Sequence, residues 1–267
     1  MPSENVATSG TARSNDRRAR KREARRDHLL DLAADIVDAD GVDGLTMAAL
    51  ADLADYATAS LYTYFSSRSA LVAALQERAL AVLGQVAEDA SLAWERAVAE
   101  AQEGDVHDPQ VVALARLCAF SDLFLVAPRR HRREFRLQQE LLATPGVEEA
   151  ADAGSVVPMA MHVLGMPQRL LHAASEAGAL HTDDAVVDLA GIPLDPALAR
   201  TFAWVLALNG ALLADGLVTG LPTTGAQLGT QLTDALLVGW GADARQLRSA
   251  RALSGPWLDL TEPSKEA

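Results

Sequence analysis

The chain has 267 residues, with 23 basic and 36 acidic side chains, a formal net charge of −13 and a single cysteine. One cysteine excludes a disulfide framework and any zinc site built from several thiolates, and it fits a reducing compartment such as the cytoplasm. A net charge of −13 also argues against a nucleic-acid partner, unless the charge is unevenly distributed.

The charge is in fact distributed unevenly. Residues 1–26 carry eight basic and three acidic side chains, a net +5, whereas residues 71–267 carry a net −11. Residues 1–16 are polar and contain no apolar run, which predicts a disordered tail and does not fit a secretory signal. The sequence therefore has a basic arm followed by an acidic body.

The composition predicts an all-α protein. Alanine accounts for 52 residues, leucine-rich windows recur and β-branched runs are few; alanine and leucine are the strongest helix formers. A first helix is expected from Arg17 to Asp40-Gly41, because apolar residues recur at helical spacing between Leu29 and Val37 and glycine commonly follows a helix.

Two short helices joined by a tight turn are expected next. Thr46 caps the first, which is buried through Met47, Leu50 and Leu53, and the second covers residues 57–64. This is helix-turn-helix geometry, in which the second helix enters the major groove of DNA; a plain helical hairpin is the alternative. All three tyrosines fall within nine positions here, and the outward-facing side chains suit phosphates and base edges: Thr58, Ser60, Tyr62, Thr63 and Tyr64.

Residues 45–71 resemble the DNA-binding domain of TetR-family transcriptional regulators; they read LTMAALADLADYATASLYTYFSSRSAL. The resemblance covers residues 22–75 and includes Gly41, Leu45-Thr46-Met47, Leu50-Ala51, Ala54, Leu61-Tyr62, Tyr64-Phe65, Arg68 and Leu71. Asp55-Tyr56-Ala57 stands where the family usually has Gly-Val-Ser. Ala57 removes the serine that usually caps the second helix, a loss of about 1 kcal/mol.

The resemblance implies which side chains contact DNA. The residues implied to contact phosphates are Thr46, Tyr62, Tyr64 and Arg68. Those implied to face the groove are Thr58, Ser60 and Thr63. The basic arm would lie along the DNA backbone or reach into the minor groove, and its residues nearest the domain are Arg22, Arg25 and Arg26.

The body is expected to be helical. A long helix starts at Arg68, another runs from Pro109 to Val126, and Pro128 opens an arginine-rich helix to about Ala143. Prolines at 158 and 167 predict a kinked or split helix over residues 146–179. Later helices are expected over 196–218, 223–240 and 242–253, and polar residues in 202–218 argue against a membrane span. The domains are thus a tail (1–16), a three-helix DNA-binding domain (17–70), a helical ligand-binding and dimerisation domain (71–253) and a second tail (254–267).

The body offers candidates for a dimer interface and for a ligand cavity. Helices in 196–240 combine small residues with leucines, which favours a four-helix bundle across a two-fold axis; an internal core hairpin is the alternative. A cavity for a largely apolar effector is expected among residues 85–180, although each candidate taken singly is more often a core residue: Trp94, Phe120, Phe124, Met159, His162, Met166 and His172.

The remaining motifs suggest no chemistry. The histidines lack metal-ligand spacing, and neither a phosphate-binding loop nor a nucleophile elbow is present, so neither an enzyme nor a cofactor is expected. Cys118 lies in an apolar helix and is expected to be buried. The basic run Arg129–Arg136 could bind an anion, but a solvated helix face with i,i+4 ion pairs is the simpler interpretation.

The sequence thus favours a cytoplasmic transcriptional repressor that binds a palindromic operator in double-stranded DNA as a homodimer and is released by a small molecule. One alternative is a DNA-binding regulator or activator without a ligand. Another is an all-α enzyme or lipid carrier with a vestigial DNA-binding module.

Overall fold

The computed structural model describes residues 7–102, 108–143, 150–181, 186–187, 193–194, 196–217 and 223–261. The regular secondary structure of these residues is helical apart from one antiparallel pair of two-residue strands, β1 (Val186–Val187) and β2 (Pro193–Leu194), with Val186 opposite Leu194. The chain forms two compact units. Unit 1 comprises Met1–Ala79 with Glu140–Val157, and unit 2 comprises Leu80–Gln139 with Pro158–Ala267. The predicted all-α class is confirmed.

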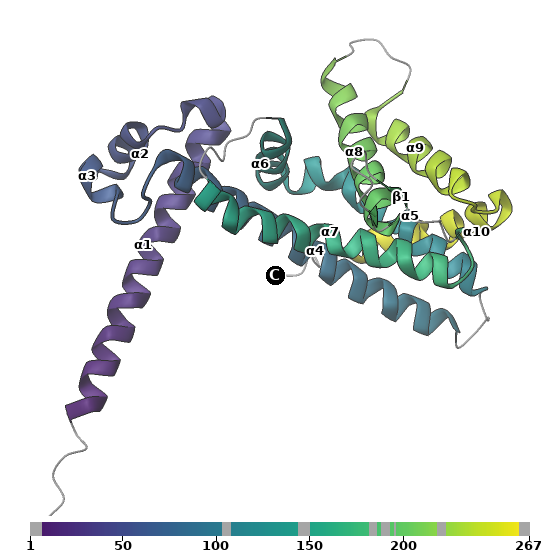
Figure 1. Ribbon diagram of the computed structural model, residues 1–267, viewed down its shortest axis with the longest axis horizontal. Helices are drawn as coiled ribbons and strands as arrows, with labels where there is room; N and C mark the ends of the chain where they lie inside the picture. The colour runs from purple at the N-terminus through teal and green to yellow at the C-terminus, as the bar shows by residue number, and fades with distance from the viewer. Residues whose placement is uncertain are drawn as a thin grey trace, which may run out of the picture. The chain divides into compact units, whose positions relative to one another are not determined.

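Unit 1 begins with α1 (Ala7–Gly44), which Figure 1 shows as a long helix extending well past α2 (Met47–Ala54) and α3 (Thr58–Leu61). The helix starts ten residues before the expected Arg17, so the segment predicted as a tail is helical from Ala7. Gly41 (φ 76°, ψ 179°) interrupts the helical geometry where the sequence predicted the end of the helix. Glycine adopts this positive φ without steric cost.

The cap of α2 and the turn between α2 and α3 have the geometry that the sequence predicted. Thr46 caps α2, because its hydroxyl accepts a hydrogen bond from the Ala49 amide at 3.0 Å. Asp55 closes the turn in the left-handed conformation (φ 55°, ψ 45°) that aspartate tolerates. Ala57 supplies no side-chain cap to α3, and the regular helix lasts only to Leu61.

Two details of this motif differ from the prediction. The second helix is shorter than residues 57–64, because residues 62–64 continue it as tight turns, with the Tyr64 amide donating to the Leu61 oxygen at 2.8 Å. Leu53 was expected in the core but is 51 % exposed. It lies two residues after the buried Ala51, and two helical steps of 100° put these side chains on opposite faces.

The long helix α4 (Arg68–Gln102) begins in unit 1, and the boundary between the units falls after its residue Ala79. The helices that follow are α5 (Pro109–Arg130), α6 (Arg132–Ala143), α7 (Ala150–Glu176), α8 (Pro196–Leu217), α9 (Gly225–Gly239), α10 (Ala244–Ser254) and the 3-10 helix η1 (Gly255–Thr261). They belong to unit 2, except that the end of α6 from Glu140 and the start of α7 to Val157 belong to unit 1. Helix α5 is the central element of unit 2 and packs against α8, α9, α10 and η1. Its buried residues include Cys118, as predicted, and burial raises the pKa of that thiol to about 12.

Two proline-based predictions are wrong. Pro128 lies inside α5 rather than at the start of the next helix, and the break comes at His131 (φ −129°, ψ 55°). A proline removes a hydrogen bond to the carbonyl four residues earlier, and it weakens the last turn without ending the helix at its own position. Helix α7 runs as one helix from Ala150 to Glu176, through Pro158 and Pro167, so the prediction of a split helix is wrong.

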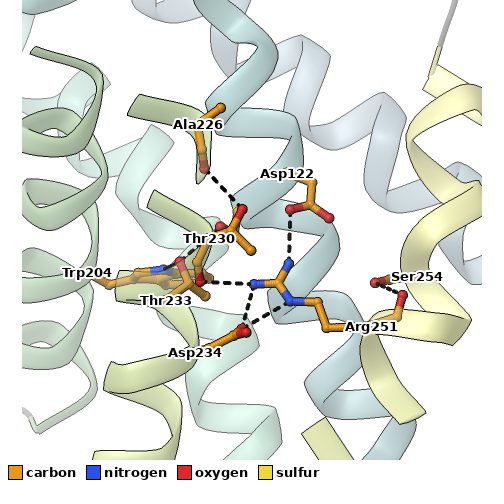
Figure 2. A network of polar contacts seen from close by, with 9 residues as sticks. Asp122, Trp204, Ala226, Thr230, Thr233, Asp234, Arg251 and Ser254 are labelled. Carbon is orange, nitrogen blue, oxygen red and sulfur yellow. Dashed lines mark hydrogen bonds and ion pairs between the residues drawn. The ribbon is translucent and has the colours of Figure 1, made fainter. Parts of the chain in front are cut away.

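Helix α10 is attached to α5 and α9 by a half-buried ion-pair network, which Figure 2 shows from close by. Arg251 lies between Asp122 of α5, at 3.0 Å, and Asp234 of α9, at 2.7 Å. Next to it, the Thr233 hydroxyl bonds to Ser121 at 2.9 Å and accepts a hydrogen bond from the Trp204 indole at 3.0 Å. These contacts join α5, α8, α9 and α10 to one another.

Three described segments are long and apolar enough to cross a membrane by length and composition alone: Arg68–Glu100, Pro109–Arg130 and Ala197–Ala214. The segment Ala197–Ala214 corrects the expectation that polar residues exclude a membrane-spanning length here. Asp215, one of those polar residues, lies just past the end of this segment. In the structure α5 is a core helix, with 61 % of its window buried.

Candidate DNA-binding surface and effector cavity

The candidate DNA-binding surface consists of α3 and the turns that follow it, residues 58–64. Leu61 and Phe65 anchor this segment, since they are 0 % and 3 % exposed. Between these anchors, Tyr62 is 52 % exposed and Thr63 is exposed as well, while Tyr64 is half-buried. Thr58 and Ser60 are also exposed. The segment thus presents hydroxyl and phenol groups to solvent from a backbone fixed at both ends.

The basic arm also contacts this segment. Arg22 Nη2 donates a hydrogen bond to the main-chain oxygen of Thr63 at 2.7 Å, and the Arg26 guanidinium lies over the Phe65 ring, 5.4 Å from its centroid. Arg25, between them in sequence, is exposed. We call residues 58–65 the recognition segment. Of the three predicted arm residues, Arg22 and Arg26 contact this segment, and Arg25 faces solvent. The sequence carries no signal for these contacts, because they join positions about forty residues apart.

Arg68 is placed differently from its expected position on a phosphate. Its Nε donates to the Leu45 oxygen and its Nη2 to the Val42 oxygen, each at 2.6 Å, and the side chain is half-buried. Two of its three guanidinium nitrogens thus bind the protein's own backbone. Arg68 fixes the first turn of α4 to the connection between α1 and α2.

Unit 2 contains a cavity of about 70 Å³ that opens to solvent. Its lining is apolar apart from Arg130, His131 and Gln138, and the apolar residues are Leu83, Val86, Ala87, Phe120, Leu123, Phe124, Val126, Ala127, Phe135, Val163, Leu164, Pro167 and Val205. Three phenylalanine rings form one wall: Phe124 lies 6.4 Å from Phe120 and 5.5 Å, edge-on, from Phe135. Apolar walls with a few polar groups are typical of sites that bind small, largely apolar molecules.

Of the seven predicted ligand-binding residues, the structure places Phe120 and Phe124 in the cavity wall. Trp94 is buried in the core instead and stacks on Trp257 with ring centroids 6.4 Å apart. Met166 is likewise a core residue.

Of the other three predicted residues, only His172 has a described side chain, and it does not line the cavity. His172 is exposed, and its Nε2 lies 3.4 Å from a Glu176 carboxylate oxygen. Met159 and His162 lie in α7, outside the described side chains.

The sequence analysis missed the contributions of α4 and α6 to the cavity. Leu83, Val86 and Ala87 have the i, i+3, i+4 spacing of one helix face, but such a face is normally packed against a neighbour, so the spacing alone does not indicate a cavity. Helix α6, which supplies Phe135 and Gln138, is held to α8 by a hydrogen bond from Gln139 Nε2 to the buried Asn209 Oδ1 at 3.1 Å.

The predicted dimer helices carry an exposed apolar face. On α8, Phe202, Leu206 and Leu213 are 42 %, 56 % and 55 % exposed, and on α9 Val238 is 46 % exposed. The three α8 residues share one helix face by their spacing of four and seven. A side chain added at Gly210 on α8 would meet no atom within 4 Å.

No group of three or more histidine, cysteine, aspartate or glutamate side chains that could hold a metal ion is found among the described residues.

Comparisons with known proteins agree with this architecture. A sequence model of the tetR family of bacterial regulatory proteins matches residues 29–75. A protein of unknown function from Rhodococcus sp. RHA1 is similar in structure, with 25 % identity, a TM-score of 0.54, and 80 % of this chain and 94 % of that chain covered.

Two further solved structures are similar to this chain. A proposed TetR-family transcriptional regulator from Mesorhizobium loti is 14 % identical, with a TM-score of 0.50, and 82 % of this chain and 98 % of that chain are covered. RolR in complex with resorcinol is 20 % identical over 88 % of this chain and 95 % of that chain, and its TM-score of 0.49 is too low to support an inference about this chain's ligand. A comparison with curated protein sequences found no match.

Proposed function

We propose that the chain is a ligand-responsive repressor of the TetR family, whose sequence model matches residues 29–75, the helix-turn-helix segment. A homodimer binds a palindromic operator, and a small, largely apolar effector releases it. The observation that carries this proposal is the cavity in unit 2, because Leu83, Val86 and Ala87 in its wall belong to α4, the same helix whose first residue, Arg68, is fixed to the helix-turn-helix.

The proposed DNA contacts are made by the solvent-accessible polar side chains of the recognition segment. Thr58, Ser60 and Thr63 face the base edges of the major groove, and Tyr62 and Tyr64 bind phosphates on either side. Thr46 uses its hydroxyl as the α2 cap, and its exposed position leaves it at the same surface. The arm adds positive charge, and Arg25 faces solvent, where a DNA backbone would pass.

We propose that two chains pair through α8 and α9, within residues 196–240. Burying Phe202, Leu206 and Leu213 removes a row of exposed apolar side chains from water, which is the main driving force of association.

The proposed switch works through α4. An effector between α4, α5 and α6 shifts the α4 residues in the wall, and Arg68 transmits the shift to the Leu45 and Val42 carbonyls at the base of the helix-turn-helix. Two half-sites must be about one DNA turn apart, so a displacement of a few ångströms at each recognition segment prevents simultaneous binding. Effector and DNA then oppose each other reciprocally. Because the target is DNA, we propose that the protein acts in the cytoplasm.

The test begins with selection of a binding sequence from a random duplex library, followed by fluorescence anisotropy with and without apolar small molecules. The proposal expects a palindromic site and a lower DNA affinity when the cavity is occupied. In the variant Ala127→Phe, which fills the cavity from α5, DNA binding should persist and the response to small molecules should be lost. Full DNA binding with no response to any cavity ligand would favour the alternative of a regulator or activator without an effector.

A further inference from the structure

Among the described residues, the polar side chains that line the effector cavity come from one short stretch of the chain. Arg130 is the last residue of α5, His131 joins α5 to α6, and Gln138 lies in α6; all three are half-buried. The thirteen apolar lining residues come from α4, α5, α6, α7 and α8. The cavity therefore has an extended apolar wall and one polar side.

This polar side is electropositive. The described lining contains a guanidinium and an imidazole and no carboxylate. The negative end of the α5 dipole and the positive end of the α6 dipole meet here and oppose each other, so the positive charge of this side comes from Arg130. Arg130 also has interactions within the protein, and a ligand would share its guanidinium rather than find it unoccupied.

The physical consequence is a preference for one charge type. Around apolar walls the effective dielectric constant is low, so a charged ligand group interacts with these side chains more strongly than it would in water. A ligand cation would be repelled and would lose its hydration without compensation, whereas a ligand anion would accept charge-assisted hydrogen bonds. A neutral ligand would gain only from the apolar wall.

We infer that the effector is an apolar molecule carrying a single carboxylate, with the carboxylate beside Arg130, His131 and Gln138 and the apolar body against Phe120, Phe124 and Phe135. This inference rests on the proposed function, since it specifies the chemical class of the ligand that the cavity takes. It is independent of the DNA sequence recognised.

The experiment compares three probes with the same eight-carbon body: octanoate, 1-octanol and octylammonium. Their dissociation constants are measured on the full-length protein by isothermal titration calorimetry at neutral pH, below micelle-forming concentrations. Octanoate is expected to bind at least tenfold more tightly than 1-octanol, and octylammonium to bind most weakly. Equal affinity for octanoate and 1-octanol would overturn the carboxylate assignment and leave the proposed function standing.

Two matched variants locate the anion site. Arg130→Gln should reduce octanoate affinity about tenfold and leave 1-octanol affinity unchanged, while Arg129→Gln, one residue earlier and outside the lining, should change neither. The ratio of the two affinities is measured within each variant, so a change in overall stability does not affect it. Equal losses in both variants would overturn the inference, because they would indicate only a long-range charge effect. Failure of all three probes to bind wild-type protein would contradict both the inference and the effector part of the proposed function.

Discussion

Arg22 donates a hydrogen bond from Nη2 to the main-chain oxygen of Thr63, 41 residues further along the chain and 2.7 Å away. The basic arm therefore does more than supply charge, because it fixes the segment that carries the proposed groove-facing side chains. Thr63 also donates from its hydroxyl to the Ser60 oxygen at 2.7 Å, so the end of the recognition segment is held from both sides.

Replacing Arg22 should weaken DNA binding more than replacing an arm residue of equal charge. Arg22→Ala is expected to lower the affinity about tenfold and Arg18→Ala, at an exposed arm position, only a few-fold. If both side chains reach phosphates, each loss should reduce the slope of log affinity against log salt by about one. Anisotropy titrations at several salt concentrations separate the two effects; equal affinities for the two variants would show that the Thr63 contact does not contribute.

Arg68 should support DNA binding by holding the helix-turn-helix in place and not by contacting a phosphate. Arg68→Ala removes two hydrogen bonds to backbone oxygens and should destabilise the protein by about 2 kcal/mol in urea unfolding. It should also weaken DNA binding without changing the salt slope. A slope reduced by about one, with unchanged stability, would instead support the phosphate contact implied by the family resemblance.

The recognition segment can be stabilised by restoring its missing cap. Ala57 has the extended conformation of an N-cap (φ −67°, ψ 132°) but no side chain to accept a hydrogen bond. Ala57→Ser should raise the unfolding free energy by about 1 kcal/mol, whereas Ala59→Ser, at an exposed position within α3, should give no increase. Urea denaturation of the two variants measures the difference, and a stabilisation shared by both would rule out the cap as its cause.

Asp122 should give stability a characteristic pH dependence. Burial raises the pKa of this carboxyl above its ordinary value of 3.8, against the opposing attraction of Arg251. Because the folded state holds the proton more tightly than the unfolded state, this residue's contribution to stability rises as pH falls through the raised pKa towards 3.8, and it is lost above that pKa. The variant Asp122→Asn lacks the titrating carboxyl. The difference in unfolding free energy between wild type and variant, measured by urea denaturation, should therefore change with pH. A difference that stays constant with pH would contradict the raised pKa of Asp122.

Dimerisation should depend on the apolar face of α8. Leu206 and Leu92 are almost equally exposed, at 56 % and 57 %, but Leu92 lies on α4. Leu206→Glu should convert the dimer to monomer in sedimentation velocity, and Leu92→Glu should leave it a dimer. A dimer in both variants would place the interface elsewhere.

The sequence predicted the local structure of the helix-turn-helix well, because short-range chemistry determines it. The Thr46 cap, the break at Gly41 and the left-handed turn at Asp55 each depend on one residue and its immediate neighbours. Leu53 was assigned to the wrong face because a helix of eight residues has too few positions for its periodicity to fix the buried direction.

The cavity could be predicted only in part. Phe120 and Phe124 were found because they are large apolar residues on a central helix, yet the same criterion selected Trp94, which packs on a partner more than 160 residues away in sequence. Whether an apolar face lines a cavity or fills a core depends on contacts between distant helices, which periodicity does not record. Arg130 was attributed to a solvated helix face for the same reason.

The most direct test of the account is the thermodynamic coupling between the cavity and DNA. The operator affinity is measured with and without a saturating amount of the tightest-binding eight-carbon probe, and the affinity for that probe is measured with and without operator. The proposed switch predicts that the probe lowers the operator affinity and the operator lowers the probe affinity by the same factor, about tenfold or more. Occupation of the cavity with no change in operator affinity would contradict it.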